Sequence, residues 1–154
     1  MKTPDQQDFD HEEIVPTLEI VTREVLVEKI SKLNKEPNMA IRILFTGDRI
    51  SCCDEGVIML AKENIIGFAT VAPEGEEQSG QPTIVGLYVV PEYRSKGYGG
   101  QILQKAIERC FERGFKNVRM DVMSSNATKI IQKLPKDIQN KLDVHDHGNI
   151  MDNF

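Results

Sequence analysis

The most continuous apolar stretch of the chain is a run of mostly β-branched residues at positions 83–90. This run, ended by Pro91, predicts a buried strand, because proline has no amide to donate to a neighbouring strand. A short polar segment follows, and then apolar residues recur three and four positions apart from Ile102 to Phe111. The spacing places them on one face of an amphipathic helix, and Gly114 supplies a left-handed stop for it.

The pattern on either side of this strand and helix predicts further elements. Residues 57–61 and 65–71 are apolar runs separated by a short polar turn, which favours a hairpin. Gly67 in the second run marks a bulge or a close approach of another backbone. Residues 117–123 form another strand-like run, which should pair in parallel with residues 83–90 because a helix connects the two.

The two ends of the chain have less regular patterns. Apolar residues at helical spacing predict a helix over residues 17–35, with Thr17 as its N-cap. Residues 39–45 are apolar but fit a helix as well as a strand. A short helix is expected over residues 127–134, and residues 142–148 hold one short strand at most.

The segment between the buried strand and the amphipathic helix is rich in glycine, with Gly97, Gly99 and Gly100 close together. The first amides of a helix lack partners and carry partial positive charge, and glycine lets an oxyanion approach them. Arg94 and Lys96 add positive charge beside this turn. The segment therefore predicts a phosphate-binding turn, the alternative being an ordinary connection that uses glycine for its geometry.

Three glycine-rich phosphate motifs compete at this place. A P-loop is excluded because no lysine followed by serine or threonine opens the helix. The dinucleotide fingerprint is met at Gly97 and Gly99, but Ile102 stands at its third glycine position. Asp121 lies near the spacing expected for a ribose-binding acid, so that interpretation stays open.

The third motif fits better. Residues 87–100 read LYVVPEYRSKGYGG, and they resemble the acyl-CoA motif of the GNAT superfamily of N-acetyltransferases. That motif is a strand ending V-x-P, then two residues, then R/Q-x-x-G-x-G/A, and its fixed positions are met by Val89, Pro91, Arg94, Gly97 and Gly99. The resemblance covers residues 57–132. It implies an α/β fold with a mixed central sheet flanked by helices and a shortened C-terminal part, in which residues 11–15 best match the family's first strand.

The resemblance implies that acetyl-CoA binds as the acyl donor. Its pantetheine arm would pair with exposed backbone of the 83–90 strand, in the gap where this strand and the 117–123 strand diverge. The residues expected to contact it are Leu87, Tyr88, Val89, Arg94, Ser95, Lys96, Gly97, Tyr98, Gly99, Gly100 and Asn126. Asn126 could equally be the N-cap of the helix that follows it.

The resemblance also implies transfer of an acetyl group to a primary amine, which needs a base because an ammonium cannot attack a thioester. Asp121 falls where some bacterial members carry a glutamate base, and an ion pair with Arg119 is its alternative role. Tyr88 is the second catalytic candidate, although an aromatic side chain on a strand also suits the core. A backbone amide near Val89 is the family's usual oxyanion donor. Lys133 stands where the family has its tyrosine acid, so the acid is not assigned.

The acceptor side of the site is less defined. Glu74, Glu76 and Glu77 lie on a polar loop and form either an acidic lip for a cationic amine or a plain solvated surface. His145 and His147 would share one face of a strand. Three roles stay open for them: a histidine base, a pair of metal ligands, or residues of a plain surface tail. Two ligands are too few for a closed metal site, and no metal is expected.

Length and composition place these motifs in one domain, residues 1–154, with residues 1–13 flexible and residues 138–154 an atypical tail. The 40% of hydrophobic residues suffices for one core. The net charge of −5 argues against nucleic acid as a partner and favours a cationic small molecule. An open sheet edge near the C-terminus would allow a homodimer.

Membrane and secreted classes are not expected. No stretch is long and apolar enough to span a membrane, and the first residues lack the apolar part of a signal peptide. Three cysteines, two of them adjacent, make no disulfide framework and indicate reduced thiols in a cytoplasmic protein.

The sequence thus predicts an acetyl-CoA-dependent N-acetyltransferase that acts on a primary amine of a small molecule or peptide. The missing tyrosine and the short C-terminal part leave a second interpretation, an acyl-CoA-binding module with little or no catalysis that serves as a sensor or partner subunit. A nucleotide-binding domain of the dinucleotide type is the third.

Overall fold

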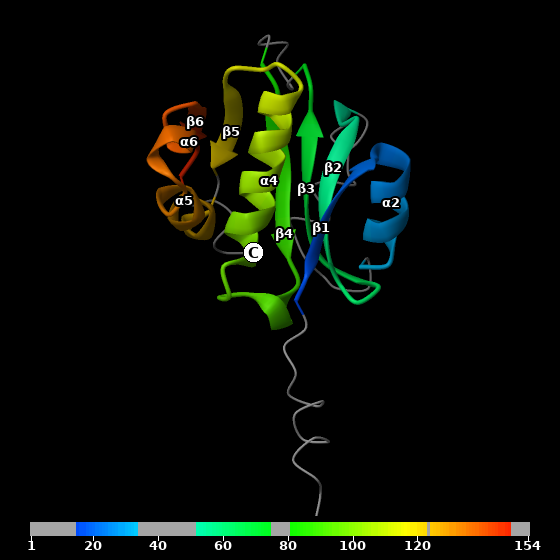
Figure 1. The fold of residues 1–154 in the computed structure, drawn as a ribbon. Helices are drawn as coiled ribbons and strands as arrows, with labels where there is room; N and C mark the ends of the chain where they lie inside the picture. The colour runs from blue at the N-terminus through cyan, green and yellow to red at the C-terminus, as the bar shows by residue number, and fades with distance from the viewer. Residues whose placement is uncertain (1–14, 34–51, 75–80, 123, 149–154) are drawn as a thin grey trace, which may run out of the picture.

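The computed structural model describes residues 15–33, 52–74, 81–122 and 124–148. They contain a six-stranded mixed sheet of order β1-β2-β3-β4-β5-β6 (Figure 1). The strands are β1 Thr17–Thr22, β2 Glu55–Ala61, β3 Asn64–Ala72, β4 Thr83–Val89, β5 Val118–Val122 and β6 Leu142–Asp146. The first four strands pair antiparallel, β5 is parallel to β4, and β6 is parallel to β5. The helices are α2 Arg23–Ser31, η2 Pro91–Tyr93, α4 Tyr98–Glu112, α5 Ser125–Gln132 and α6 Lys136–Gln139.

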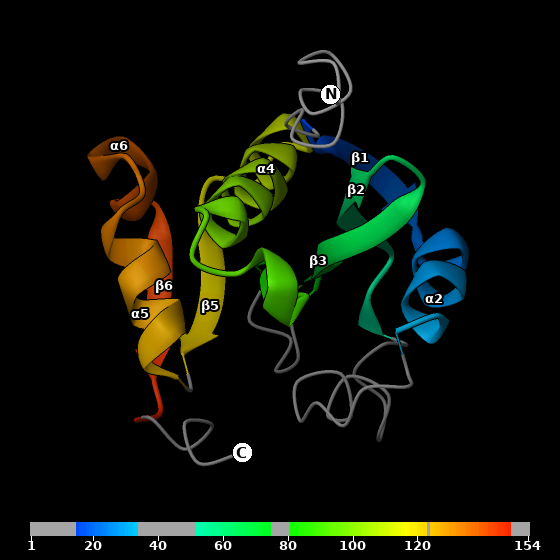
Figure 2. The ribbon, with the colours of Figure 1, turned by 90° about the horizontal axis from the view of Figure 1, so that it is seen from below.

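Helices pack on both faces of the sheet. The main core lies between the sheet and α4, α5 and α6. A smaller core lies on the other face, where Leu26 and Ile30 of α2 join Ile58 and Phe68 of the sheet. Figure 2 shows α5 and α6 beside β5 and β6, with α2 at the opposite end near β1 and β2.

The strand and the amphipathic helix at the centre of the chain are confirmed. The apolar stripe of α4 is buried from Ile102 to Cys110 and partly buried at Phe111, and burial of each large aliphatic side chain contributes about 1.5–3 kcal/mol. The helix ends as expected at Gly114, which has φ +96° and donates from its amide to the Phe111 carbonyl.

The hairpin of β2 and β3 is also confirmed, and so are both roles suggested for Gly67. The β2–β3 register shifts after Met59, which leaves Ile66 as an extra residue on β3 beside Gly67. A Cβ on Gly67 would lie 2.6 Å from Ile102 Cδ1 and 2.9 Å from the Tyr88 carbonyl oxygen. Only glycine therefore lets α4 and β4 pack this closely here.

The single helix expected over residues 17–35 is wrong in its first part. Residues Thr17–Thr22 form β1, which pairs with β2, and α2 begins at Arg23. Thr22, not Thr17, is the N-cap, since its hydroxyl accepts from the Val25 amide at 3.4 Å. This segment is rich in β-branched residues, and its apolar positions fit the repeat of a strand as well as that of a helix. Pairing with β2 therefore selects the strand. The strand expected at residues 11–15 and the element at residues 39–45 fall mainly outside the described residues.

The two parallel strands diverge as expected. β4 pairs with β5 only at Thr83 and Ile84, opposite Arg119 and Met120. Immediately afterwards Val85 is an extra residue in the pairing of β4 with β3, and such a bulge bends the strand. The short strand expected within residues 142–148 is β6, and it joins the far side of β5.

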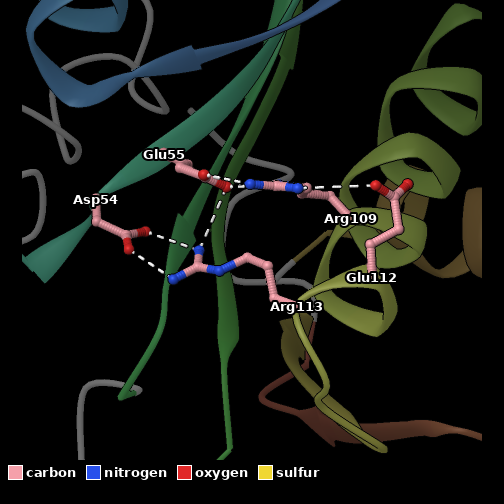
Figure 3. Close-up of polar contacts among 5 residues, drawn as sticks. All are labelled: Asp54, Glu55, Arg109, Glu112 and Arg113. Carbon is pink, nitrogen blue, oxygen red and sulfur yellow. Dashed lines mark hydrogen bonds and ion pairs between the residues drawn. The ribbon is translucent and has the colours of Figure 1, made fainter.

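The C-terminal half of α4 is tied to the start of β2 by ion pairs (Figure 3). Arg109 forms a bidentate ion pair with Glu55, in which its guanidinium donates to the two carboxylate oxygens at 2.8 and 3.0 Å. Arg113 bonds Asp54 at 2.7 Å and Glu55 at 3.3 Å, while Glu112 lies 3.7 Å from Arg109. The hydrogen bond from Arg109 lowers the pKa of Glu55 despite partial burial. These pairs fix the position of α4 along its axis, and hence that of its N-terminus.

Cys52, Cys53 and Cys110, all within the described residues, form no disulfide, and burial raises the pKa of Cys110 to about 11. Within the described ranges, no helix has the length and apolarity needed to cross a membrane.

Candidate active site

The segment between β4 and α4 is a tight turn that contains two left-handed residues. Ser95 has φ +65° and Gly97, the N-cap of α4, has φ +82°, which glycine adopts without strain. The rings of Tyr93 and Tyr98 pack across the turn with centroids 6.4 Å apart, and Lys96 Nζ lies 5.9 Å from the Tyr93 ring. The turn and the start of α4 lie at the carboxyl end of β4 (Figure 1).

The first amides of α4 have no side-chain cap. In α2 and α5 the hydroxyls of Thr22 and Ser124 accept from the first turn, whereas the N-cap of α4 is Gly97, which has no side chain. The first intrahelical bond runs from the Gln101 amide to the Gly97 carbonyl at 3.3 Å. A Cβ on Gly100 would meet nothing within 4 Å. The helix thus presents amide donors and positive dipole to open space, which suits a phosphate oxyanion.

Gly99 serves a different purpose in the same turn. It is buried, and a Cβ there would lie 3.0 Å from Ile130 Cδ1 of α5 and 3.7 Å from Val89 Cγ2 of β4. The second glycine of the motif therefore lets α4 pack closely on its neighbours, while Gly100 borders the open space.

Arg94 folds back onto the strand instead of extending from the turn. Its Nε donates to the Val89 carbonyl at 2.7 Å, and its guanidinium carbon lies 5.3 Å from the centre of the Tyr88 ring. Tyr88 is buried, with its ring 5.8 Å from that of Phe68 in the smaller core. The structure thus gives Tyr88 the core position that the sequence left as its alternative role, and its catalytic role stays a prediction.

The edge of β4 beyond Ile84 faces the diverging strand β5. The Val90 amide donates to the Ile66 carbonyl of β3 at 2.8 Å. Because the backbone groups of successive strand residues point to alternate sides, those of Leu87 and Val89 point toward β5. β5 pairs with β4 only near its start, so the Leu87 backbone and the Val89 amide face a ligand in the gap, while the Val89 carbonyl accepts from Arg94.

Asp121 lies on β5 just beyond the last residue paired with β4. Its neighbours Met120 and Val122 are buried in the main core, so Asp121 and Arg119 point to the opposite face of the sheet. Arg119 bonds both carboxylate oxygens, at 3.0 and 3.3 Å, and His147 Nε2 lies 2.7 Å from Oδ1. Burial raises the pKa of Asp121, but the bonds from Arg119 and His147 outweigh it and lower the pKa overall.

A second aspartate–histidine pair lies on the same face. His145 Nε2 is 3.0 Å from Asp143 Oδ2, and Gln81 donates to the same oxygen at 2.6 Å. These bonds with His145 and Gln81 lower the pKa of Asp143. His145 and His147 thus share one face, as their spacing predicts. Among the described side chains, no group of three or more His, Cys, Asp or Glu could hold a metal ion.

Sequence reasoning considered a histidine base but missed its partner. Asp121 and His147 are 26 positions apart, and only the parallel pairing of β5 with β6 brings them together. The available signal was the alternation of Asp143, His145 and His147 along a short strand.

The remaining predicted residues occupy separate places. Asn126 is exposed in the first turn of α5, and the N-cap there is Ser124, so the capping role suggested for Asn126 is wrong. Its contact with acetyl-CoA stays a prediction. Glu74 is exposed after the end of β3, while Glu76 and Glu77 lie outside the described residues. Lys133 is exposed at the C-cap of α5.

Comparison with known proteins gives both sequence and structural relatives. The sequence model of the Acetyltransferase (GNAT) family matches residues 28–130. No curated protein sequence matches the chain. An aminoglycoside acetyltransferase from an uncultured soil metagenomic sample, in complex with sisomicin, is 16% identical, with a TM-score of 0.54 over 79% of this chain and 88% of that one.

Two further solved structures have the same fold. A GNAT family N-acetyltransferase from Escherichia coli in complex with CoA is 13% identical, with a TM-score of 0.59 over 77% of this chain and 68% of that one. The IAA acetyltransferase from Bacillus cereus is 16% identical, with a TM-score of 0.58 over 77% and 75%. At these identities the structures establish the fold, a mixed sheet with flanking helices, as expected. The family match spans most of the chain and includes β4, the glycine turn and α4, and the chain therefore belongs to the GNAT acetyltransferase family.

Proposed function

We propose that this protein is an acetyl-CoA-dependent N-acetyltransferase that acts on a primary amine of a small molecule or peptide. The observation that carries the proposal is the arrangement of two backbone surfaces that border the gap between β4 and β5. The uncapped amides at the start of α4 lie beside the end of β4, whose edge faces the diverging β5. One surface suits a pyrophosphate and the other suits an extended amide-containing arm.

The residues present fit acetyl-CoA in charge and space. The pyrophosphate would lie against the amides of Tyr98, Gly99 and Gly100, with Lys96 beside it, where the open space at Gly100 leaves room. The pantetheine amides would pair with the Leu87 backbone, since the Val89 carbonyl accepts from Arg94. When bound, the thioester supplies the acetyl group and a thiolate leaving group.

The chain itself would provide the rest of the chemistry. The Val89 amide, which points toward the gap between β4 and β5, is placed to donate to a developing oxyanion. An amine acceptor is supported by the net charge of −5 and by a structural relative that is an aminoglycoside acetyltransferase in complex with sisomicin. Glu74, Glu76 and Glu77 are proposed as the acidic residues that attract such an acceptor.

The first test is calorimetric titration with acetyl-CoA, CoA and NADH. We expect micromolar binding of acetyl-CoA, about −8 kcal/mol, and no binding of NADH. Gly100→Glu should weaken acetyl-CoA binding at least tenfold, because its carboxylate would occupy the open space and repel the pyrophosphate. Gln132→Glu adds the same charge at the exposed end of α5 and should bind as the wild type does. Equal affinity in both variants would contradict the placement of the pyrophosphate.

Turnover is measured as CoA release from acetyl-CoA with a panel of amines. Release that depends on the amine supports the transferase, whereas tight binding without release would identify the acyl-CoA-binding module considered above. Binding of NADH instead of acetyl-CoA would indicate a dinucleotide-binding domain.

A further inference from the structure

The pair formed by Asp121 and His147 lies beside the point where β4 and β5 diverge, at the gap proposed for the acyl donor. Asp121 is the residue after Met120, the last β5 residue paired with β4, so it borders the point at which the two strands diverge. The His147 amide donates to the Val122 carbonyl at 2.8 Å, which fixes the histidine backbone against the end of β5. The pair therefore lies at the carboxyl ends of β5 and β6, on the face of the sheet opposite α4.

The hydrogen bond between the two side chains determines which ring nitrogen is free. Nε2 of His147 lies 2.7 Å from Oδ1 of Asp121. An ionised carboxylate only accepts, so the neutral imidazole must donate from Nε2 and keep its lone pair on Nδ1. Arg119 bonds both oxygens of the same carboxylate and holds it in place. The imidazole is thus oriented as a proton acceptor.

We propose that His147 is the general base of the acetyl transfer and that Asp121 is the residue that positions it. Nδ1 takes one proton from the acceptor ammonium, and the neutral amine nitrogen then forms a bond to the acetyl carbon. The bond from that carbon to the CoA sulfur breaks, and its electron pair stays on sulfur. The nitrogen loses its second proton to the thiolate, and His147 returns the first to solvent. This inference rests on the proposed function.

The surroundings favour His147 over Asp121 for this role. The Asp121 side chain is 15% exposed and both its oxygens are bonded, whereas the His147 side chain is 47% exposed. A carboxylate with a lowered pKa is also a poor base near neutral pH.

Within the described residues, the charged groups that flank His147 lie on β5 and β6. Asp121 and Arg119 come from β5, the element packed against its strand. On its own strand His145 is paired with Asp143, and the carboxylate of Asp146 accepts from the Gly148 amide. Thus the pair with Asp121 is the contact that sets the protonation pattern of the His147 ring.

The test compares His147→Gln with His145→Gln, its matched control on the same face with its own aspartate. Acetyl transfer is measured from acetyl-CoA to spermidine, whose amines are protonated at neutral pH, and to hydroxylamine, which is largely neutral. His147→Gln should lower kcat with spermidine about 100-fold and remove the acid limb of the pH profile of kcat/KM. It should change kcat with hydroxylamine less than about fivefold and leave the affinity for acetyl-CoA unchanged.

Asp121→Asn separates the two candidate bases. If Asp121 only positions the imidazole, adding this change to His147→Gln lowers kcat little further, because the two residues act as a unit. Full activity of His147→Gln with spermidine, or an equal loss of kcat with both acceptors, would overturn the base role of His147. Either result would leave the proposed function in place. A wild-type protein that binds acetyl-CoA but acetylates neither acceptor would overturn the proposed function and the base role with it.

Discussion

Arg94 Nε donates to the backbone carbonyl of Val89, 2.7 Å away, so the turn after β4 is bonded back to the strand that it leaves. The Val89 backbone points toward the diverging β5, the edge proposed for the pantetheine arm. Arg94 would therefore do more than place a charge near the proposed pyrophosphate site, because its side chain holds the end of β4 and the turn in one geometry.

Arg94→Met should weaken acetyl-CoA binding by about tenfold, close to 1.4 kcal/mol, since it removes a charge-assisted bond while keeping the length of the side chain. Lys96→Met removes an equal charge from the same turn, and the ammonium of Lys96 lies over the ring of Tyr93. We expect a smaller loss of affinity for this variant by calorimetry. Equal losses would mean that Arg94 acts through charge alone.

Gly99→Val should reduce stability because of helix packing. Its added atoms would press on Ile130 Cδ1, which lies 3.0 Å from the position of a Cβ. Overpacking of this kind costs about 1–3 kcal/mol in the free energy of unfolding. Ile130→Ala should make room, so that the double variant is more stable than the sum of the two single changes predicts. Gly100→Val, which meets nothing within 4 Å, is the control in thermal unfolding. A purely additive double variant would contradict the contact.

The features predicted from the sequence are those that local chemistry fixes. Pro91 must end a strand, and glycine suits the left-handed backbone at Gly97 and Gly114, so the glycine turn and the limits of α4 follow from the residues themselves. The parallel pairing of β4 with β5 follows in the same way from the helix between them.

The features that were missed depend on register between distant segments. Residues Thr17–Thr22 have apolar spacing that suits a strand or a helix, and their pairing with β2 selects the strand. The contact of His147 with Asp121 arises because β6 lies beside β5 with His145 opposite Asp121. Neither relationship is visible in the local pattern of one sequence.

Gly67→Ala should destabilise the protein although the change is one methyl group. The new Cβ would lie 2.9 Å from the Tyr88 carbonyl oxygen, a backbone atom that cannot move aside as a side chain can. We expect a loss of about 2 kcal/mol in the free energy of unfolding, measured with urea. Gly100→Ala, in the open first turn of α4, should be neutral or stabilising by up to about 1 kcal/mol. Similar values for the two variants would contradict the close approach at Gly67.

Glu55 should make the stability of the fold dependent on acid pH. The hydrogen bond from Arg109 lowers its pKa in the folded state, so the unfolded chain binds more protons as the pH falls toward 4.5. The stabilisation from Glu55 is therefore present above the unfolded pKa and is lost as the pH falls through the lower folded value. At pH 7, Glu55→Gln should lose about 1 kcal/mol in the free energy of unfolding.

The difference between Glu55→Gln and wild type should shrink as urea unfolding is repeated from pH 7 down to pH values of about 3. Glu112→Gln is the matched control, because Glu112 is half exposed and lies 3.7 Å from the same Arg109. A surface pair of this kind contributes less than about 0.5 kcal/mol, and its removal should leave the pH dependence unchanged. A gap between wild type and Glu55→Gln that stays constant with pH would show that Glu55 stabilises α4 by packing and not by its charge.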